Sequence, residues 1–119
     1  MQTNLNSQKV PETLLDRRRH PRYRFSEPIT ICAPGGVVIP GIGIEISASG
    51  LSAITAGSLQ VNDTLEIERI AGDKMPAIVR RNIGRVSGFE FLNVTAEQAQ
   101  RIRESCALLP LYQGKSLGI

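Results

Sequence analysis

The sequence predicts a mainly β protein, a small antiparallel barrel of six or seven strands followed by one C-terminal helix. Three observations support this fold. Short segments rich in β-branched residues follow one another between residues 25 and 92, with turn signals between them. After residue 95 the hydrophobic period changes from two residues to about 3.6. The 119 residues, 41% hydrophobic and 21% charged, suffice for one domain with its own core.

The strands are predicted from β-branched residues and from alternation. Ile29, Thr30 and Ile31 give β-branched bulk to the first strand, and Pro34–Gly36 reads as the turn that ends it. Leu65 and Ile67 alternate with glutamates in a later strand. The predicted strands cover residues 25–33, 37–47, 51–55, 64–70, 76–82 and 85–92.

The second strand carries three isoleucines at every other position. Ile42, Ile44 and Ile46 are therefore expected to share one face of the sheet. Pro40 and Gly41 interrupt the first half of the strand, which indicates a bulge or an edge position.

The end of the chain has a helical pattern. Thr95–Gln98 fits a capping box, in which the side chains of the first and fourth residues bond each other's backbone amides. Ile102, Cys106 and Leu109 then recur at helical spacing. A helix over residues 96–108 would place these three side chains on one buried stripe.

The chain divides into a polar lead-in, one domain and a tail. Residues 1–13 have no hydrophobic period and are expected to be flexible. Residues 14–109 form the single domain, and residues 110–119 are expected to be a loose tail. The domain consists of an arginine-rich arm, the barrel and the helix, over residues 17–24, 25–92 and 96–108.

The positive charge is concentrated at the N-terminus. The net charge is +3, but residues 1–24 hold six basic and two acidic side chains, whereas residues 25–119 hold eight basic and nine acidic ones. This distribution excludes a uniformly basic coat for nucleic acid and favours a local anion-binding arm.

Enzyme signatures are missing from the sequence. His20 is the only histidine, and Cys32 and Cys106 are far apart and belong to no metal-binding pattern. Both cysteines are predicted to be reduced, small core residues of a cytoplasmic protein. No hydrophobic run is long enough to span a bilayer. We therefore expect no catalytic residue, no metal, no cofactor and no membrane insertion.

Two short motifs suggest a binding site. The first is an Arg-x-x-x-Arg spacing at Arg18 and Arg22, and the second is the acid-x-Ser-x-x-Gly spacing of Glu45, Ser47 and Gly50. Arginine forks match guanine O6 and N7 and also pair with phosphate. A carboxylate accepts from the N1–H and N2–H₂ donors of guanine, and a serine hydroxyl can donate to phosphate. Together these groups suit a guanine nucleotide that carries phosphate.

The order of these motifs on a β-rich frame resembles the PilZ domain family, the bacterial receptor modules for cyclic di-GMP. The resemblance covers roughly residues 16–109, with Arg18 and Arg22 matching the first family motif and Ser47 and Gly50 matching the second. Glu45 stands where the family has Asp or Asn. The resemblance implies a PilZ-like barrel that is no enzyme and has cyclic di-GMP as its ligand.

The resemblance also implies a mechanism. Arg18 and Arg22 would clasp the dinucleotide against Glu45, Ser47 and Gly50, and the ordering of the arm would signal to a downstream protein partner of unknown identity. The possible supporting contacts are Arg17, Arg19 and Ser49. The extra methylene of Glu45 is expected to weaken binding without abolishing it.

Three alternatives remain open at the level of the sequence. The first is a PilZ-like protein-interaction module with weak or no nucleotide binding, which Glu45 favours and the retained arginines oppose. The second is a barrel that binds RNA or DNA through its arm. Tyr23 is the only aromatic residue of the basic region, so the sequence argues against a nucleic-acid ligand. The third is that the arginine cluster is only a solubilising tail.

Overall fold

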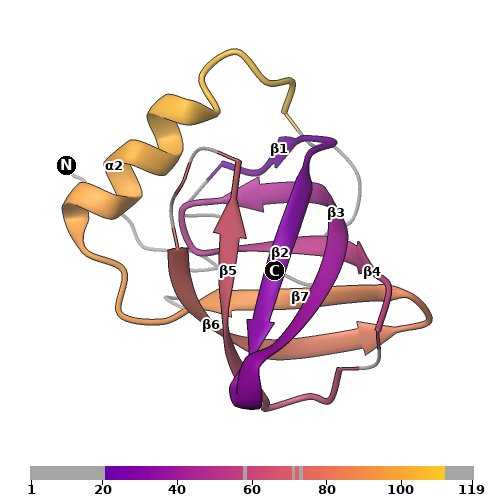
Figure 1. Ribbon diagram of the computed structural model, residues 1–119. Helices are drawn as coiled ribbons and strands as arrows, with labels where there is room; N and C mark the ends of the chain where they lie inside the picture. The colour runs from indigo at the N-terminus through magenta and orange to yellow at the C-terminus, as the bar shows by residue number, and fades with distance from the viewer. Residues whose placement is uncertain (1–20, 58, 71, 73, 112–119) are drawn as a thin grey trace, which may run out of the picture.

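The computed structural model of the chain describes residues 21–57, 59–70, 72 and 74–111. Seven strands and one α-helix make up this part of the chain (Figure 1). The strands are β1 (Tyr23–Arg24), β2 (Pro28–Ala33), β3 (Val37–Ser47), β4 (Gly50–Thr55), β5 (Thr64–Arg69), β6 (Lys74–Ile83) and β7 (Val86–Phe91). The 3₁₀ turn η1 (Pro34–Gly36) joins β2 to β3, and the α-helix is α2 (Ala96–Ser105).

The strands form one antiparallel sheet that closes on itself. Their order is β1-β3-β2-β5-β6-β7-β4, and an additional pairing of β3 with β4 closes six of them into a barrel. The short strand β1 lies outside this ring, and β3 is its partner among the described strands. Closure leaves the barrel without the exposed edges of an open sheet. The predicted barrel with a C-terminal helix is confirmed.

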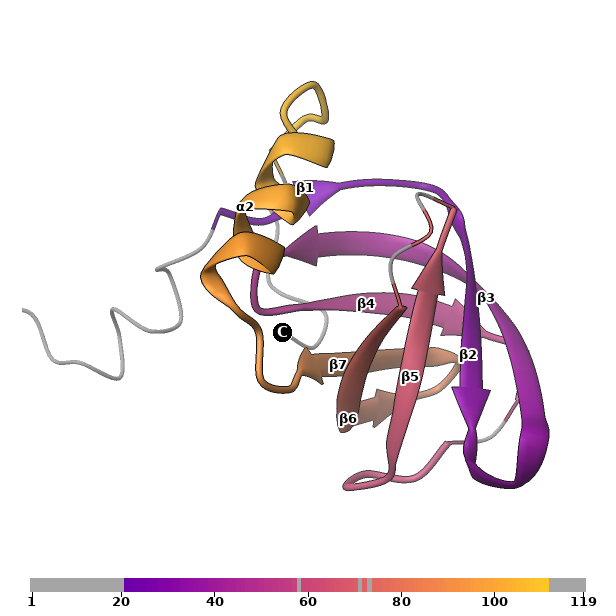
Figure 2. The same ribbon diagram turned by 60° about the vertical axis from the view of Figure 1, so that its left-hand side comes forward.

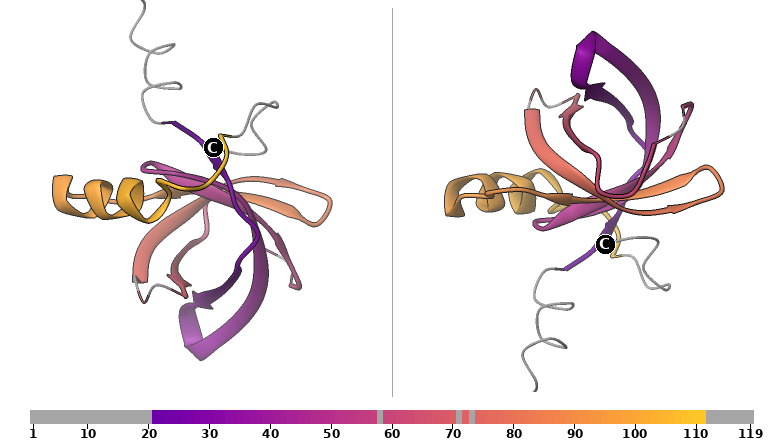
Figure 3. Two further views of the ribbon diagram at one scale, coloured as in Figure 1. Left: turned by 90° about the horizontal axis from the view of Figure 1, so that it is seen from above. Right: turned by 90° about the horizontal axis from the view of Figure 1, so that it is seen from below.

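The core fills the barrel and continues to the helix. The largest fully buried side chains include Phe89, Ile31, Ile46 and Leu51. Helix α2 contributes Ile102 and Cys106 to the same cluster, and it lies at the opposite end of the molecule from the β2–β3 turn (Figures 2 and 3).

Arg69 ties the helix to the barrel. Its guanidinium donates to Ser105 Oγ at 3.2 Å and lies 3.7 Å from a carboxylate oxygen of Glu27. It also stacks over the ring of Phe25, 5.9 Å from the ring centroid. One nearly buried side chain thus joins the end of β5 to α2 and to the segment before β2.

The predicted elements are recovered with shifted ends. Strand β3 has its predicted bounds, whereas the regular ladder of β2 begins at Pro28 and not at residue 25. Only single bonds tie residues 25–27 to β3, for example the Phe25 amide to Ile44 O. Helix α2 ends at Ser105 and not at residue 108, because the Cys106 and Ala107 amides bond carbonyls three residues back and tighten the last turn. The sequence did not predict strand β1.

The predicted shared face of the three isoleucines in β3 is wrong because the strand contains a β-bulge. The pairing of β3 with β4 shifts register between Gly43 and Glu45, so Ile44 is an extra residue. Ile42 is consequently exposed, Ile44 is half-buried and Ile46 is buried, and the three do not share one face as expected. The bulge turns Glu45 away from the core, onto the outer face of the barrel.

Cys32 also departs from its prediction. Cys106 is buried in the core, but Cys32 is only half-buried. Cys32 pairs with Val38 and Glu66, both of which are exposed, so it lies on the outer face. Both thiols are free, as expected.

Candidate functional site

Strand β1 brings the arginine arm to the second motif. Its two residues pair with the end of β3, Tyr23 opposite Ile46 and Arg24 opposite Glu45. The end of the described chain adds to this pairing, because the Arg24 amide bonds Pro110 O at 2.8 Å and Leu111 forms a bridge to Tyr23. Tyr23 and Arg24 are therefore held between β3 and the residues after α2.

Arg22 and Glu45 lie together across this junction. Arg22 Nη1 is 3.7 Å from Glu45 Oε1, and Ser52 Oγ donates to Glu45 Oε2 at 3.2 Å. The Glu45 side chain is 0% exposed and that of Arg22 is 28% exposed. A fully buried carboxylate requires such partners because an uncompensated buried charge is costly. Glu45 thus faces outward but is enclosed.

Ser52 was not found by the sequence-based reasoning, although a signal for it exists. The turn after β3 pairs Ser47 with Gly50. In an antiparallel hairpin the partners then follow by counting outward from the turn, which places Ser52 opposite Glu45 as observed. A serine opposite a buried glutamate supplies the hydroxyl that the carboxylate needs.

The second motif forms a tight turn between β3 and β4. Ser47 is buried and its Oγ accepts from the Ser49 amide at 3.1 Å and lies 2.9 Å from Ser49 Oγ. Ser49 is exposed and Gly50 is buried. The serine pair fixes the turn as a local side-chain-to-backbone motif. The hydroxyl predicted to meet a phosphate is thus held by Ser49 in this structure.

Part of the predicted site lies outside the described residues. These residues are Arg17, Arg18 and Arg19. The structure therefore brings together Arg22, Glu45, Ser47, Ser49 and Gly50 of the predicted set.

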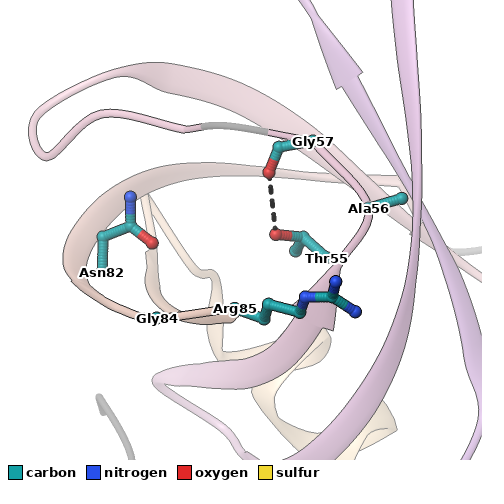
Figure 4. A pocket seen from close by; sticks show the side chains of 6 residues that line it. All are labelled: Thr55, Ala56, Gly57, Asn82, Gly84 and Arg85. Atoms are coloured by element: carbon teal, nitrogen blue, oxygen red, sulfur yellow. Dashed lines mark hydrogen bonds between the residues drawn. The ribbon is translucent and has the colours of Figure 1, made fainter.

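Two hollows lie at opposite ends of β4. The larger, of about 430 Å³, lies between the end of β4 and the β6–β7 hairpin and contains no predicted site residue (Figure 4). Thr55 Oγ1 donates across it to Gly57 O at 3.2 Å, and Arg85 is its one charged lining residue. The smaller, of about 260 Å³, adjoins the second motif at Ala48 and Ser49 and extends to the first turn of α2.

Neither a metal cluster nor a membrane span is found in the part of the chain that the structure describes. No three or more His, Cys, Asp or Glu side chains there are placed to hold a metal ion. No described helix is long and apolar enough to cross a bilayer.

The comparison with protein families decides the family. Residues 16–108 match the model of the PilZ domain. The chain belongs to the PilZ domain family. PilZ domains are regulatory receptor modules. No curated protein matches the chain.

Solved structures share the fold. The PilZ domain of CeSA from a cellulose-synthesizing bacterium is 15% identical, with a TM-score of 0.58, 72% of this chain covered and 94% of that one. The PilZ domain of Escherichia coli YcgR, solved with c-di-GMP, is 21% identical, with a TM-score of 0.61 and coverages of 76% and 92%. The Bacillus subtilis inhibitor of motility MotI/DgrA is 22% identical, with a TM-score of 0.64 and coverages of 76% and 49%.

Proposed function

We propose that this PilZ domain is a receptor for cyclic di-GMP, which it binds on the outer face of the barrel between the arginine arm and the β3–β4 turn. The observation that carries the proposal is the Arg22–Glu45 contact, because it joins the two sequence motifs at one point. The E. coli YcgR domain, which has the same fold, was solved with c-di-GMP.

The residues at this junction have the chemistry that the ligand requires. Cyclic di-GMP is a dianion with two guanine bases, and arginine recognises both phosphate and the O6 and N7 edge of guanine. Arg22 and Arg18 are the proposed ligands for these groups. Glu45 can accept from guanine N1–H and N2–H₂, Ser47 can donate to a phosphate oxygen, and Gly50 lets the chain turn close to the ligand. Arg17, Arg19 and Ser49 are proposed as supporting contacts.

The Arg22–Glu45 contact supports a proposal for the first step of binding. Glu45 now holds Arg22 and accepts from Ser52, so the ligand must take over Arg22 while Ser52 keeps the carboxylate partnered. Arg22 can leave because its side chain is partly exposed. This exchange of partners would change the surface at β1, and a downstream protein would bind this changed surface.

Calorimetric titration tests the proposal. We expect saturable binding of cyclic di-GMP, and much weaker binding of cyclic di-AMP, GTP and a short oligonucleotide. Arg22→Ala and Arg18→Ala should each weaken binding about tenfold or more, since a charge-assisted contact contributes about 1.5–3 kcal/mol. Arg101→Ala is the matched control, because Arg101 is an exposed arginine on α2 that pairs with Glu97.

Two results would contradict the proposal. Equal affinity for every polyanion, falling steeply with salt, would indicate generic electrostatic binding through the arm. No binding of cyclic di-GMP at millimolar concentration would favour the second candidate.

The second candidate is a protein-interaction module with weak or no nucleotide binding. The complete burial of Glu45 favours it, because the carboxylate is already partnered by Arg22 and Ser52 in the absence of any ligand. In this case Arg22→Ala would disturb the packing of β1 without any nucleotide phenotype.

A further inference from the structure

Two bulges turn charged side chains from the core to the outer face. In β3 the register shift lies between Gly43, which packs on the Phe25 ring, and Glu45. In β6 it lies between Val79, which is fully buried, and Arg81. Residues two apart in a regular strand face the same side, so without these bulges Glu45 and Arg81 would both point into the core. In both strands a β-bulge therefore turns a charged side chain, Glu45 or Arg81, to the outer face.

The two redirected residues belong to one row across the sheet. Directly opposed residues in antiparallel strands share a face, and the pairings run from Arg24 to Glu45, Ser52, Gly88 and Arg81. The row crosses β1, β3, β4, β7 and β6, of which the last four lie side by side in Figure 1. Three strand spacings, about 14 Å, separate the backbones at Glu45 and Arg81. The row therefore has an arginine at each end, with Glu45 and Ser52 between them.

The β7 position of the row carries no side chain that would separate Arg81 from Ser52 and Glu45. That position is Gly88, which has no side chain. Arginine is long enough to extend over a neighbouring strand, and a cyclic dinucleotide seated at Glu45 would reach toward β7.

Arg81 also differs in its partners from the arginine beside it. Arg80 Nε lies 2.6 Å from Glu90 Oε1, so the charge of Arg80 is compensated. Arg81 is exposed, and within the described ranges it makes no ion pair and no side-chain hydrogen bond. Arg80 is thus paired with a carboxylate, whereas the adjacent Arg81 has no charged partner among the described residues.

We propose that Arg81 is a further ligand-binding residue that contacts a phosphate of the bound dinucleotide, at the end of the site opposite the arm. This inference rests on the proposed function. The two phosphates of the dianion would then meet cations from two sides, Arg22 and the arm on one and Arg81 on the other. Neither the Arg-x-x-x-Arg spacing nor the turn motif contains Arg81.

The test compares adjacent arginines by calorimetry with cyclic di-GMP. Arg81→Ala is expected to weaken binding about tenfold, as the loss of one charged contact does. Arg80→Ala removes the same formal charge from the neighbouring residue and should change affinity less than about twofold, because surface charge acts weakly at a distance. Arg81→Lys should recover most of the affinity, since a lysine also serves a phosphate but cannot form the two-pronged contact to guanine. Thermal unfolding of each variant checks that it is folded.

The outcomes separate this inference from the proposed function. If wild type binds, Arg22→Ala does not, and Arg81→Ala matches Arg80→Ala, the receptor function stands and the role of Arg81 is overturned. If Arg81→Ala and Arg81→Lys are equally weak, the phosphate assignment is wrong. If wild type does not bind cyclic di-GMP, both proposals fall together.

Discussion

At the level of single residues, Gly43 in β3 has no space for a side chain. A Cβ built at Gly43 would lie 2.6 Å from Phe25 Cε2, well inside any real contact distance. Phe25 cannot move away easily because it is buried and its ring also lies under Arg69. Gly43→Ala should therefore lower the free energy of unfolding by about 1–3 kcal/mol, as overpacked cores do. Urea denaturation measures this loss.

Gly57 provides the control for this prediction. A Cβ at Gly57 would meet only side-chain atoms of Ile39, at 3.3 Å or more. Gly57→Ala should cost much less, because a side chain can shift by a few tenths of an ångström where a buried ring cannot. Equal losses for the two variants would mean that the Gly43–Phe25 contact does not control the packing of β3.

The two cysteines should differ sharply in reactivity. Burial raises the pKa of the Cys106 thiol, and the neighbouring Ser105 hydroxyl and Arg69 lower it only in part. The thiolate is the reactive form, so Cys106 is both covered and short of thiolate at neutral pH. A water-soluble disulfide reagent should label one thiol per folded chain quickly, Cys32, and the second only on unfolding. Fast labelling that persists in Cys32→Ser would contradict this assignment.

At the level of elements, the capping box anchors α2. Thr95 Oγ1 accepts from the Gln98 amide at 3.1 Å, and the Gln98 side chain accepts from the Thr95 amide at 2.9 Å. Thr95→Ala should lower the free energy of unfolding by about 1 kcal/mol, because the Gln98 amide loses its side-chain acceptor. Urea denaturation measures the change.

Glu97→Gln is the matched variant within the same turn. Glu97 is 81% exposed and its only described ion pair is with Arg101 on the surface. Such pairs contribute about 0.3–0.5 kcal/mol, so this variant should be nearly neutral. A Thr95→Ala variant as stable as Glu97→Gln would show that packing of Ile102 and Cys106 alone holds the helix.

The elements also show which information the local sequence contains. Alternation and turn residues place β3 and the other barrel strands within about two residues, apart from the start of β2, since they act over a few neighbours. Bulges depend on the partner strand, and this explains why the different burial of Ile42, Ile44 and Ile46 was not predicted. Strand β1 has only two residues and exists through its pairing with β3 and its bonds to residues 110 and 111. The motif residues could be named from sequence, but the enclosure of Glu45 depends on tertiary packing.

At the level of the whole molecule, strand β1 and helix α2 connect to the same part of the barrel. Strand β1 is bonded to Pro110 just beyond α2, and Arg69 joins α2 to Glu27 and Phe25 just beyond β1. A change at Arg22 is therefore two or three contacts from the surface of α2. This connection gives the proposed receptor a physical route from the ligand to a protein partner, with the closed barrel as a fixed frame.

Hydrogen exchange measured within the first minutes tests this division into a responsive edge and a fixed frame. Strand β1 is two residues long and is held by two pairs with β3 and by single contacts with Pro110 and Leu111, so its amides should open locally far more often than those of β5 and β6. Cyclic di-GMP should slow early exchange in residues 22–25 and 45–50 and leave early exchange in β5 and β6 unchanged. Arg22→Ala should remove the effect, because the ligand would no longer bridge the arm to β3. Early protection confined to β5 and β6, or present equally in Arg22→Ala, would place the ligand on another face of the barrel.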